Sequence, residues 1–249
     1  MLGIAFLYKI TLEELMAANP DIKPNLMSVG TVLIIPGARQ EEENVETETT
    51  QIQPTAIPVE TGQVFCVSTR EGGAWCSLPV RNTQEFALEG LSAVIHLVDS
   101  KSLETLSQTA FLPLDLLQPG QSLPFTAYFP PPVPAAFQAN IEIVSALPNS
   151  EDGRYLPTRI DHQQVFLTED GLSAEVKLDV FLERPDITAK RVWVAVIAYD
   201  QQGNVIGLRR WEKPGEPPLN PGEMLPVSLM IYSTTGPIHR VELAVEARP

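Results

Sequence analysis

Two cysteines have the clearest chemical potential in this chain, because a nearby pair can form a disulfide, bind a metal or do redox chemistry. Cys66 and Cys76 enclose the segment CVSTREGGAWC, and Gly72-Gly73 near its middle predicts a hairpin that brings the two ends together. We favour a disulfide, which implies an oxidising, extracytoplasmic setting; two unpaired cysteines buried in a sheet are the alternative. CxxC spacing is absent and no histidine lies nearby in sequence, which argues against a metal or redox pair.

The histidines give no sign of a catalytic or metal centre. His96, His162 and His239 are scattered, and the chain has no HExxH or other paired-histidine spacing. It also lacks the G-x-S-x-G elbow of many hydrolases, a P-loop and a GxGxxG loop. We therefore expect no enzymatic activity, no metal and no cofactor.

Paired carboxylates need more care, because the chain is acidic. A glycosidase requires two carboxyl groups that face each other across a cleft, about 5 Å or about 6.5–9.5 Å apart. The acidic residues at the start of the last third of the chain fall mostly at turns or at outward strand positions. We interpret them as a solvated face: Asp161, Glu169, Asp170, Glu175 and Asp179.

Aromatic residues could form a surface on which sugars stack. Trp193 and Tyr199 share one face of a predicted strand, and we interpret that face as core. Trp211 lies just before the loop EKPGEPPLNPG, so it is the best candidate for an exposed aromatic side chain, although packing is the role we favour for it too.

The overall composition narrows the classes of protein and partner. The 249 residues suit two or three domains, the 44% hydrophobic content is enough for real cores, and the 23 prolines favour strands and loops over long helices. A net charge of −14 and a pI of about 4.6 argue against nucleic acid and against an anionic membrane surface as partners. There is no apolar run of about 18 residues, so we expect no membrane-spanning helix.

The elements that would position these residues fall into segments of different character. Five Glu between 41 and 48, among Thr, Gln and Pro, predict a disordered acidic linker. Alternating apolar residues downstream predict strands. The segments we expect are an N-terminal module at 1–37, the linker at 38–60, a first β-sandwich at 61–148, a short linker at 149–154 and a second β-sandwich at 155–249.

The N-terminal module has the pattern of short helices followed by a strand. Thr11 and Glu14 form a capping box, which predicts a helix that starts directly after Thr11, and Pro20 ends that helix. A second short helix covers roughly 24–28, with a proline suited to its first turn. Val32–Ile35 is β-branched and predicts a strand.

The two β blocks repeat each other. AVIHLVD begins at Ala93 and AVIAYD at Ala195, and the turns Pro119-Gly120 and Pro221-Gly222 are displaced by the same 102 residues. Each block has the size, the short strands and the regular turn signals of an immunoglobulin-like sandwich. The fold class we predict is therefore mainly β, with two such sandwiches in tandem after a small α+β module.

Residues 4–36, IAFLYKITLEELMAANPDIKPNLMSVGTVLIIP, resemble the LysM module. The resemblance rests on the Ile-Ala helix start, on TLEEL and AANP around the second stretch, and on VGTVLIIP at the end. It implies a βααβ fold that binds peptidoglycan or another N-acetylglucosamine-containing glycan, in a groove lined by Pro24, Asn25, Leu26 and Met27. For Leu26 and Met27, packing in a small core is an equally good role. The family's first strand and its Gly-Asp-Thr-like turn are missing here, so we expect an N-terminally truncated module whose last strand has an unpaired edge.

The strand–turn–strand stretch VIAYDQQGNVIG, and a degraded version in the first block, are similar to FxLYD-type immunoglobulin-like domains of bacterial surface proteins. That resemblance implies a fold and no chemistry. The combined prediction is a non-catalytic bacterial envelope protein at the cell surface or wall, whose sandwiches act as spacer or display domains. Two alternatives stay open: an adhesion or assembly protein whose sandwiches bind another protein by an exposed edge, and an accessory part of a cell-wall hydrolase.

Overall fold

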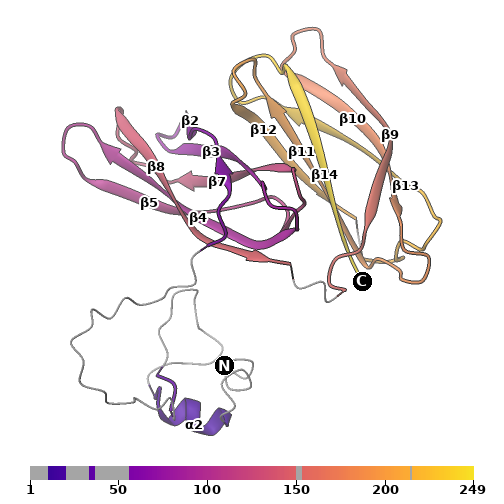
Figure 1. Ribbon diagram of the computed structural model, residues 1–249. Helices are drawn as coiled ribbons and strands as arrows, with labels where there is room; N and C mark the ends of the chain where they lie inside the picture. Colours follow the sequence, from indigo (N-terminus) through magenta and orange to yellow (C-terminus); the bar gives the residue numbers. More distant parts are fainter. Residues whose placement is uncertain (1–10, 21–33, 37–55, 150–152, 214) are drawn as a thin grey trace. The chain divides into compact units, whose positions relative to one another are not determined.

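The computed structural model describes residues 11–20, 34–36, 56–149, 153–213 and 215–249, which belong to two compact units (Figure 1). The first unit, 1–52, contains helix α2 (Leu12–Ala17) and the short segment 34–36. The second unit, 53–249, is built from strands β1 to β14. The prediction of a mainly β chain is therefore confirmed.

Strands β1 to β8 form one antiparallel sheet that folds over on itself. One half places β3 between β7 and the short strands β1 and β2, and the other half places β4 between β5 and β8. A single residue pair, Phe111 and Thr126, joins β5 to β7. The bounds are β1 Glu60–Thr61, β2 Phe65–Ser68, β3 Ala74–Arg81, β4 Leu88–Asp99, β5 Thr105–Phe111, β6 Leu116–Leu117, β7 Ser122–Phe129 and β8 Phe137–Pro148.

Strands β9 to β14 form two three-stranded antiparallel sheets, ordered β13-β10-β9 and β12-β11-β14. Apolar side chains of β10 and β13 share one core cluster with those of β11, so these two sheets pack face to face. The bounds are β9 Thr158–Leu167, β10 Ser173–Leu182, β11 Arg191–Tyr199, β12 Val205–Glu212, β13 Leu225–Tyr232 and β14 Arg240–Arg248.

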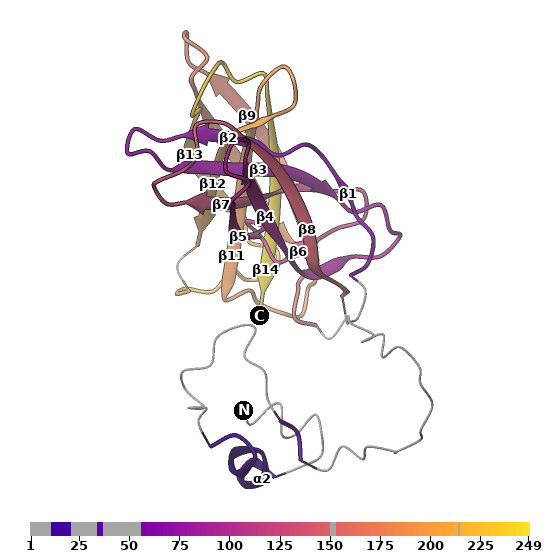
Figure 2. The ribbon, with the colours of Figure 1, turned by 90° about the vertical axis from the view of Figure 1, so that its left-hand side faces the viewer.

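The six strands of the second block pair as six strands of the first do, while β1 and β6 have no counterpart among the described residues (both blocks are drawn in Figure 2). β3 pairs with β7 as β10 pairs with β13, and β4 lies between β5 and β8 as β11 lies between β12 and β14. The Pro-Gly turns before β7 and β13 also match, because Gly120 and Gly222 both have positive φ, at 72° and 78°. The repeated letters of the sequence therefore correspond to a repeated strand order.

Structurally equivalent residues of β4 and β11 are one residue closer in sequence than the two Pro-Gly turns are. Asp99 and Asp200, displaced by 101 residues, end the two strands in the same way, since each accepts a backbone N–H two residues later, at 2.8 and 2.9 Å. Ile95 faces the first core and Val196 faces the second, whereas the identical letters would match Ile95 with Ile197. A slip of one residue exchanges the two faces of a strand, so the structure, and not letter identity, fixes which face is inward.

Strand β11 is buried on both faces, which explains its nearly continuous apolar sequence. Val194 and Val196 belong to the core of the second block, while Ile197 and Tyr199 belong to a cluster made mostly of first-block residues. Trp193 packs against that same cluster. The sheet β12-β11-β14 is thus covered by the second block's own β13-β10-β9 sheet on one side and by the first block on the other.

A buried carboxylate fixes the contact between the two blocks. Glu246 on β14 is 3% exposed and accepts the backbone N–H groups of Asp115 and Leu116, at 2.7 and 3.0 Å. Arg248 donates its Nε to Glu246 at 2.7 Å and pairs with the Asp115 carboxylate. Such charge-assisted bonds are stronger than neutral ones, so they hold the β6 segment on the edge of β14.

Candidate functional site

The described part of the N-terminal module is centred on α2, whose first turn is capped as the sequence predicts. The Thr11 hydroxyl accepts the backbone N–H of Glu14 at 3.1 Å, and the Glu14 carboxylate accepts the backbone N–H and the hydroxyl of Thr11, both at 2.8 Å. These bonds satisfy backbone donors that would otherwise lack a partner at the helix start. Two hydrogen bonds hold the pKa of Glu14 below its ordinary value of 4.5. The larger effect comes from the Thr11 backbone N–H and the smaller from the Thr11 hydroxyl.

Asn19 connects the end of this helix to the last segment of the module. Its side-chain amide donates to the carbonyl oxygens of Leu15 and Ile34, at 2.8 and 2.7 Å. Its carbonyl oxygen accepts the backbone N–H of Ile34 at 2.7 Å. Asn19 is 5% exposed, so these three bonds form away from bulk water. The side chain pairs with Ile34 as a neighbouring strand would, with one bond in each direction.

Asn19 and Ile34 flank, in sequence, the segment that was predicted to line the glycan groove. Residues 20–33 connect the two. The predicted groove residues, Pro24, Asn25, Leu26 and Met27, lie outside the described residues, as does the first half of the predicted strand Val32–Ile35. Its second half, Ile34 and Ile35, is described and is not part of a strand. Leu15, which is fully buried beside Asn19, supplies apolar packing from α2.

The two cysteines form a disulfide across the β2–β3 hairpin. Cys66 and Cys76 are directly opposite each other in the strand register, and their Cα atoms are 4.0 Å apart. The hairpin turn contains Gly72 at a φ of 84°, which a residue with a side chain rarely adopts. Cys76 is fully buried in the core of the first block, so the bridge joins the sheet edge to that core.

The histidines and acidic residues have local partners on the strands. His96 Nδ1 lies 2.8 Å from the Ser107 hydroxyl, and His162 Nδ1 lies 2.8 Å from the Asp179 carboxylate. Asp161 and Asp179 are register partners on neighbouring strands, and so do not face each other across a cleft. Among the described residues, no group of three or more His, Cys, Asp or Glu side chains could hold a metal ion.

Trp211 has the packing role favoured from the sequence, and another tryptophan is exposed. Trp211 pairs with Val194 on the inner face of its sheet and packs against the core of the second block. Trp75, by contrast, is 53% exposed on β3 and stacks with Tyr128 at 5.1 Å between ring centroids. Trp211 packs, as we favoured from the sequence, because strand parity, and not proximity to a loop, decides which face a side chain occupies. The alternation of Trp75 with buried Ala74 and Cys76 was the available signal.

Residues 3–36 match the model of the LysM domain, a range that includes α2, Asn19, Ile34 and the predicted groove residues. No curated protein matches the chain. A LysM domain implies binding of peptidoglycan or other N-acetylglucosamine-containing glycans and is typical of cell-surface proteins, with which the disulfide is compatible. Over the part of the chain that the structure describes, no helix has the length and apolar character needed to cross a membrane.

Proposed function

We propose that this chain is a non-catalytic component of the bacterial cell envelope that binds peptidoglycan through its LysM domain and displays two immunoglobulin-like sandwiches. The observation that carries the proposal is the match of residues 3–36 to the LysM domain, within which the Asn19 side chain bonds the end of α2 to Ile34. A neutral sugar needs backbone donors and acceptors and a shallow apolar floor, which a loop of such a domain can supply.

The repeated strand order supports the immunoglobulin-like part of the proposal. In each block, the second and fifth long strands pair in one layer, and the third and sixth pair in the other: β3 with β7 and β4 with β8, then β10 with β13 and β11 with β14. This arrangement resembles the crossing connections of immunoglobulin-type sandwiches. The disulfide and the display role both suit an extracytoplasmic position at the wall.

Co-sedimentation with purified peptidoglycan tests the proposal. The full chain is expected to pellet with peptidoglycan and to stay in solution with cellulose, which lacks N-acetyl groups. The chain without residues 1–37 is expected to stay in solution with both. If that shortened chain pellets equally well, the LysM domain is not the binding element. Release of soluble muropeptides during the incubation would contradict a non-catalytic role.

A second candidate function, binding of another protein through the sandwiches, is favoured by one observation. The described residues leave part of one edge of the first sandwich, on β8, without a strand partner. Exposed strand edges bind extended chains by adding a strand to the sheet.

A further inference from the structure

One side of β8 carries a stretch without a strand partner. β8 pairs with β4 along its other side. On the free side, the backbone N–H of Ile57 donates to Ala146 at 3.0 Å, close to the C-terminal end of the strand. Within the described part of the chain, no strand pairs with the free side of the stretch Phe137–Ile143. We call this stretch the β8 free edge.

The β8 free edge lacks the features by which sheet edges usually avoid pairing. Protected edges carry several charges, a proline or a bulge, or they are short. Phe137–Ile143 has Glu142 as its single charged residue and contains no proline, and the irregularity in the β4–β8 register starts directly after it, between Ile143 and Ser145. Its residues alternate cleanly between outward polar and inward apolar side chains: Gln138, Asn140 and Glu142 outward, and Phe137, Ala139, Ile141 and Ile143 inward.

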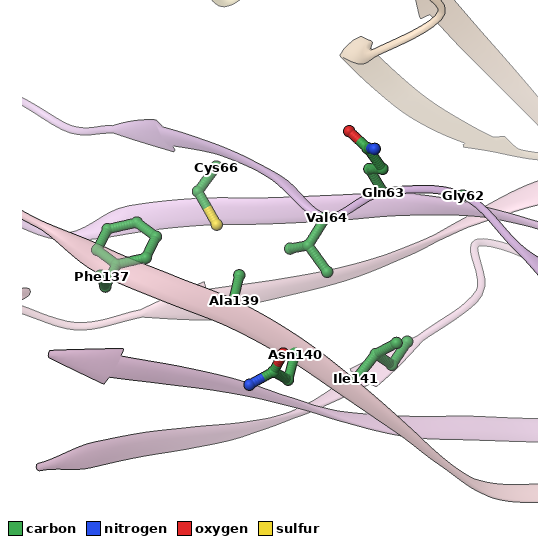
Figure 3. Close-up of a pocket in the computed structure, with 8 residues that line it drawn as sticks. All are labelled: Gly62, Gln63, Val64, Cys66, Phe137, Ala139, Asn140 and Ile141. Carbon is green, nitrogen blue, oxygen red and sulfur yellow. The ribbon is translucent and has the colours of Figure 1, made fainter. Parts of the chain in front are cut away.

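The inward side chains border an opening in the sandwich (Figure 3). Val64 and Cys66 line it from the β1–β2 side, and Phe137, Ala139 and Ile141 line it from β8. These β8 side chains are only partly buried, although they pack against the first core cluster. A strand added along the β8 free edge would place its own alternate side chains over this opening and complete their burial.

The matching opening in the second block is already flanked by the first block. β14 takes the place of β8 there, and its edge is paired at Leu156 and Ala247. The cavity beside Val241 and Leu243 of β14 is also lined by first-block residues, namely Arg81, Gly120, Gln121 and Ser122. β14 is also an edge strand, but first-block residues line the cavity beside it, whereas the cavity beside β8 is lined by the first block alone.

We propose that the β8 free edge pairs antiparallel with the same stretch of a second copy of the chain, so that two β5-β4-β8 sheets join into one. The midpoint of Phe137–Ile143 is Asn140, and a two-fold axis there uses the whole stretch. A closed two-fold contact requires a self-complementary surface. Since the argument rests on β8 alone, it goes beyond glycan binding and does not depend on it.

The pairing that this axis creates is complementary on both faces. On the outer face, Gln138 lies opposite Glu142 of the second copy, where an amide N–H can donate to the carboxylate, and Asn140 lies opposite itself. On the inner face, Phe137 lies opposite Ile143 and Ala139 lies opposite Ile141, so that every inward pair is apolar. No like charges face each other. The same stretch of a second copy therefore has the alternation of apolar and polar side chains that a strand covering this opening needs.

Analytical ultracentrifugation of the full chain over a wide concentration range tests the proposal. The wild-type chain is expected to show a monomer–dimer equilibrium. Gln138→Glu places Glu opposite Glu, and Gln138→Lys places Lys opposite Glu, twice per dimer in each case because of the two-fold axis. The dimer Kd is expected to rise with Gln138→Glu and to fall with Gln138→Lys, by about 2- to 30-fold each. Gln164→Glu and Gln164→Lys, on the exposed part of β9, make the same charge changes away from the edge and should leave the Kd unchanged.

Hydrogen exchange locates the contact independently. The amides of Phe137–Ile143 are expected to gain protection as the protein concentration rises. Three results would each overturn the proposal. The chain could stay monomeric at every concentration, the dimer Kd could be unchanged by both Gln138 substitutions, or both substitutions could shift the Kd in the same direction. Asn19→Ala, which disturbs the glycan module, is expected to dimerise normally, so loss of peptidoglycan binding and loss of dimerisation are separate results.

Discussion

Substituting Asn19 tests how far the N-terminal module depends on one side chain. Asn19→Ala removes three hydrogen bonds, two to Ile34 and one to Leu15, from a position that is 5% exposed. Asn19→Asp keeps the acceptor for the Ile34 N–H but replaces the amide donor by an oxygen. That oxygen would face the carbonyl oxygens of Leu15 and Ile34 at the present 2.8 and 2.7 Å.

The expected magnitude follows from the number of bonds. At about 0.5–1.5 kcal/mol net for each hydrogen bond, Asn19→Ala should lower the free energy of unfolding of the module by about 1.5–4.5 kcal/mol. Domains below about 40 residues are marginally stable without disulfides or metals, so a loss of this size should unfold much of the module. Asn19→Asp should be at least as damaging at neutral pH, because its charged carboxylate is placed against two carbonyl oxygens. It should recover partly in acid, where a protonated carboxyl can again donate one bond.

Two measurements check this reasoning. Peptidoglycan pelleting should fall strongly for both variants at neutral pH, and the Ile34 amide should lose protection from hydrogen exchange. Glu13→Gln, an exposed change on the same helix, serves as the control and should behave as wild type. If Asn19→Ala keeps both full glycan binding and a protected Ile34 amide, the Asn19 bonds do not hold the module together. If Asn19→Asp proves milder than Asn19→Ala at neutral pH, the assignment of the amide donor is wrong.

Three further results are expected. Glu246→Ala leaves the backbone N–H groups of Asp115 and Leu116 without their acceptor and removes one of the two carboxylates that pair with Arg248. Urea denaturation should therefore show a loss of about 3 kcal/mol or more and a first and second block that no longer unfold together. Reduction of the Cys66–Cys76 bridge, whose residues are 10 apart in sequence, should destabilise the first block by about 3 kcal/mol, measured by urea denaturation with and without reductant. Folding lowers the pKa of Glu14, so the stabilisation of the module by this carboxylate is present above the unfolded pKa of 4.5 and is lost as pH falls through the lower folded pKa. Thermal unfolding of the module should show this loss of stability in acid, and Glu14→Gln should make the stability less dependent on pH.

Local features of the fold could be predicted because their causes are local. The capping box lies within one helical turn, so Thr11 and Glu14 were sufficient to place the start of α2. Gly203 has the positive φ, 86°, that its turn after Asp200 requires. The duplicated blocks were visible because the strand order and the Pro-Gly turns repeat together.

Other features could not be predicted because their causes lie far away in the sequence. The partner of Asn19 is 15 residues downstream, and no periodicity connects an amide side chain to the backbone of Ile34. One face of β11 is buried because the first block packs against it, and the sequence of a strand does not specify which other block will cover it. The sequence favoured packing for Trp211 but could not name its partners, since its neighbours along the chain are a loop while its neighbours in space are a core.

The contrast between the outer faces of β4 and β11 gives the duplicated pair a fixed order. The β4 face carries Ser92, Val94, His96 and Val98, all partly exposed, whereas the corresponding β11 face is apolar and covered by the first block. The two blocks share a strand order, but each has the outer face suited to its place as first or second block. An exchange of their order would leave the apolar face of β11 in water and place Ser92 and His96 of β4 in a core. The two blocks are therefore not interchangeable parts, and a shuffled gene should yield an insoluble protein.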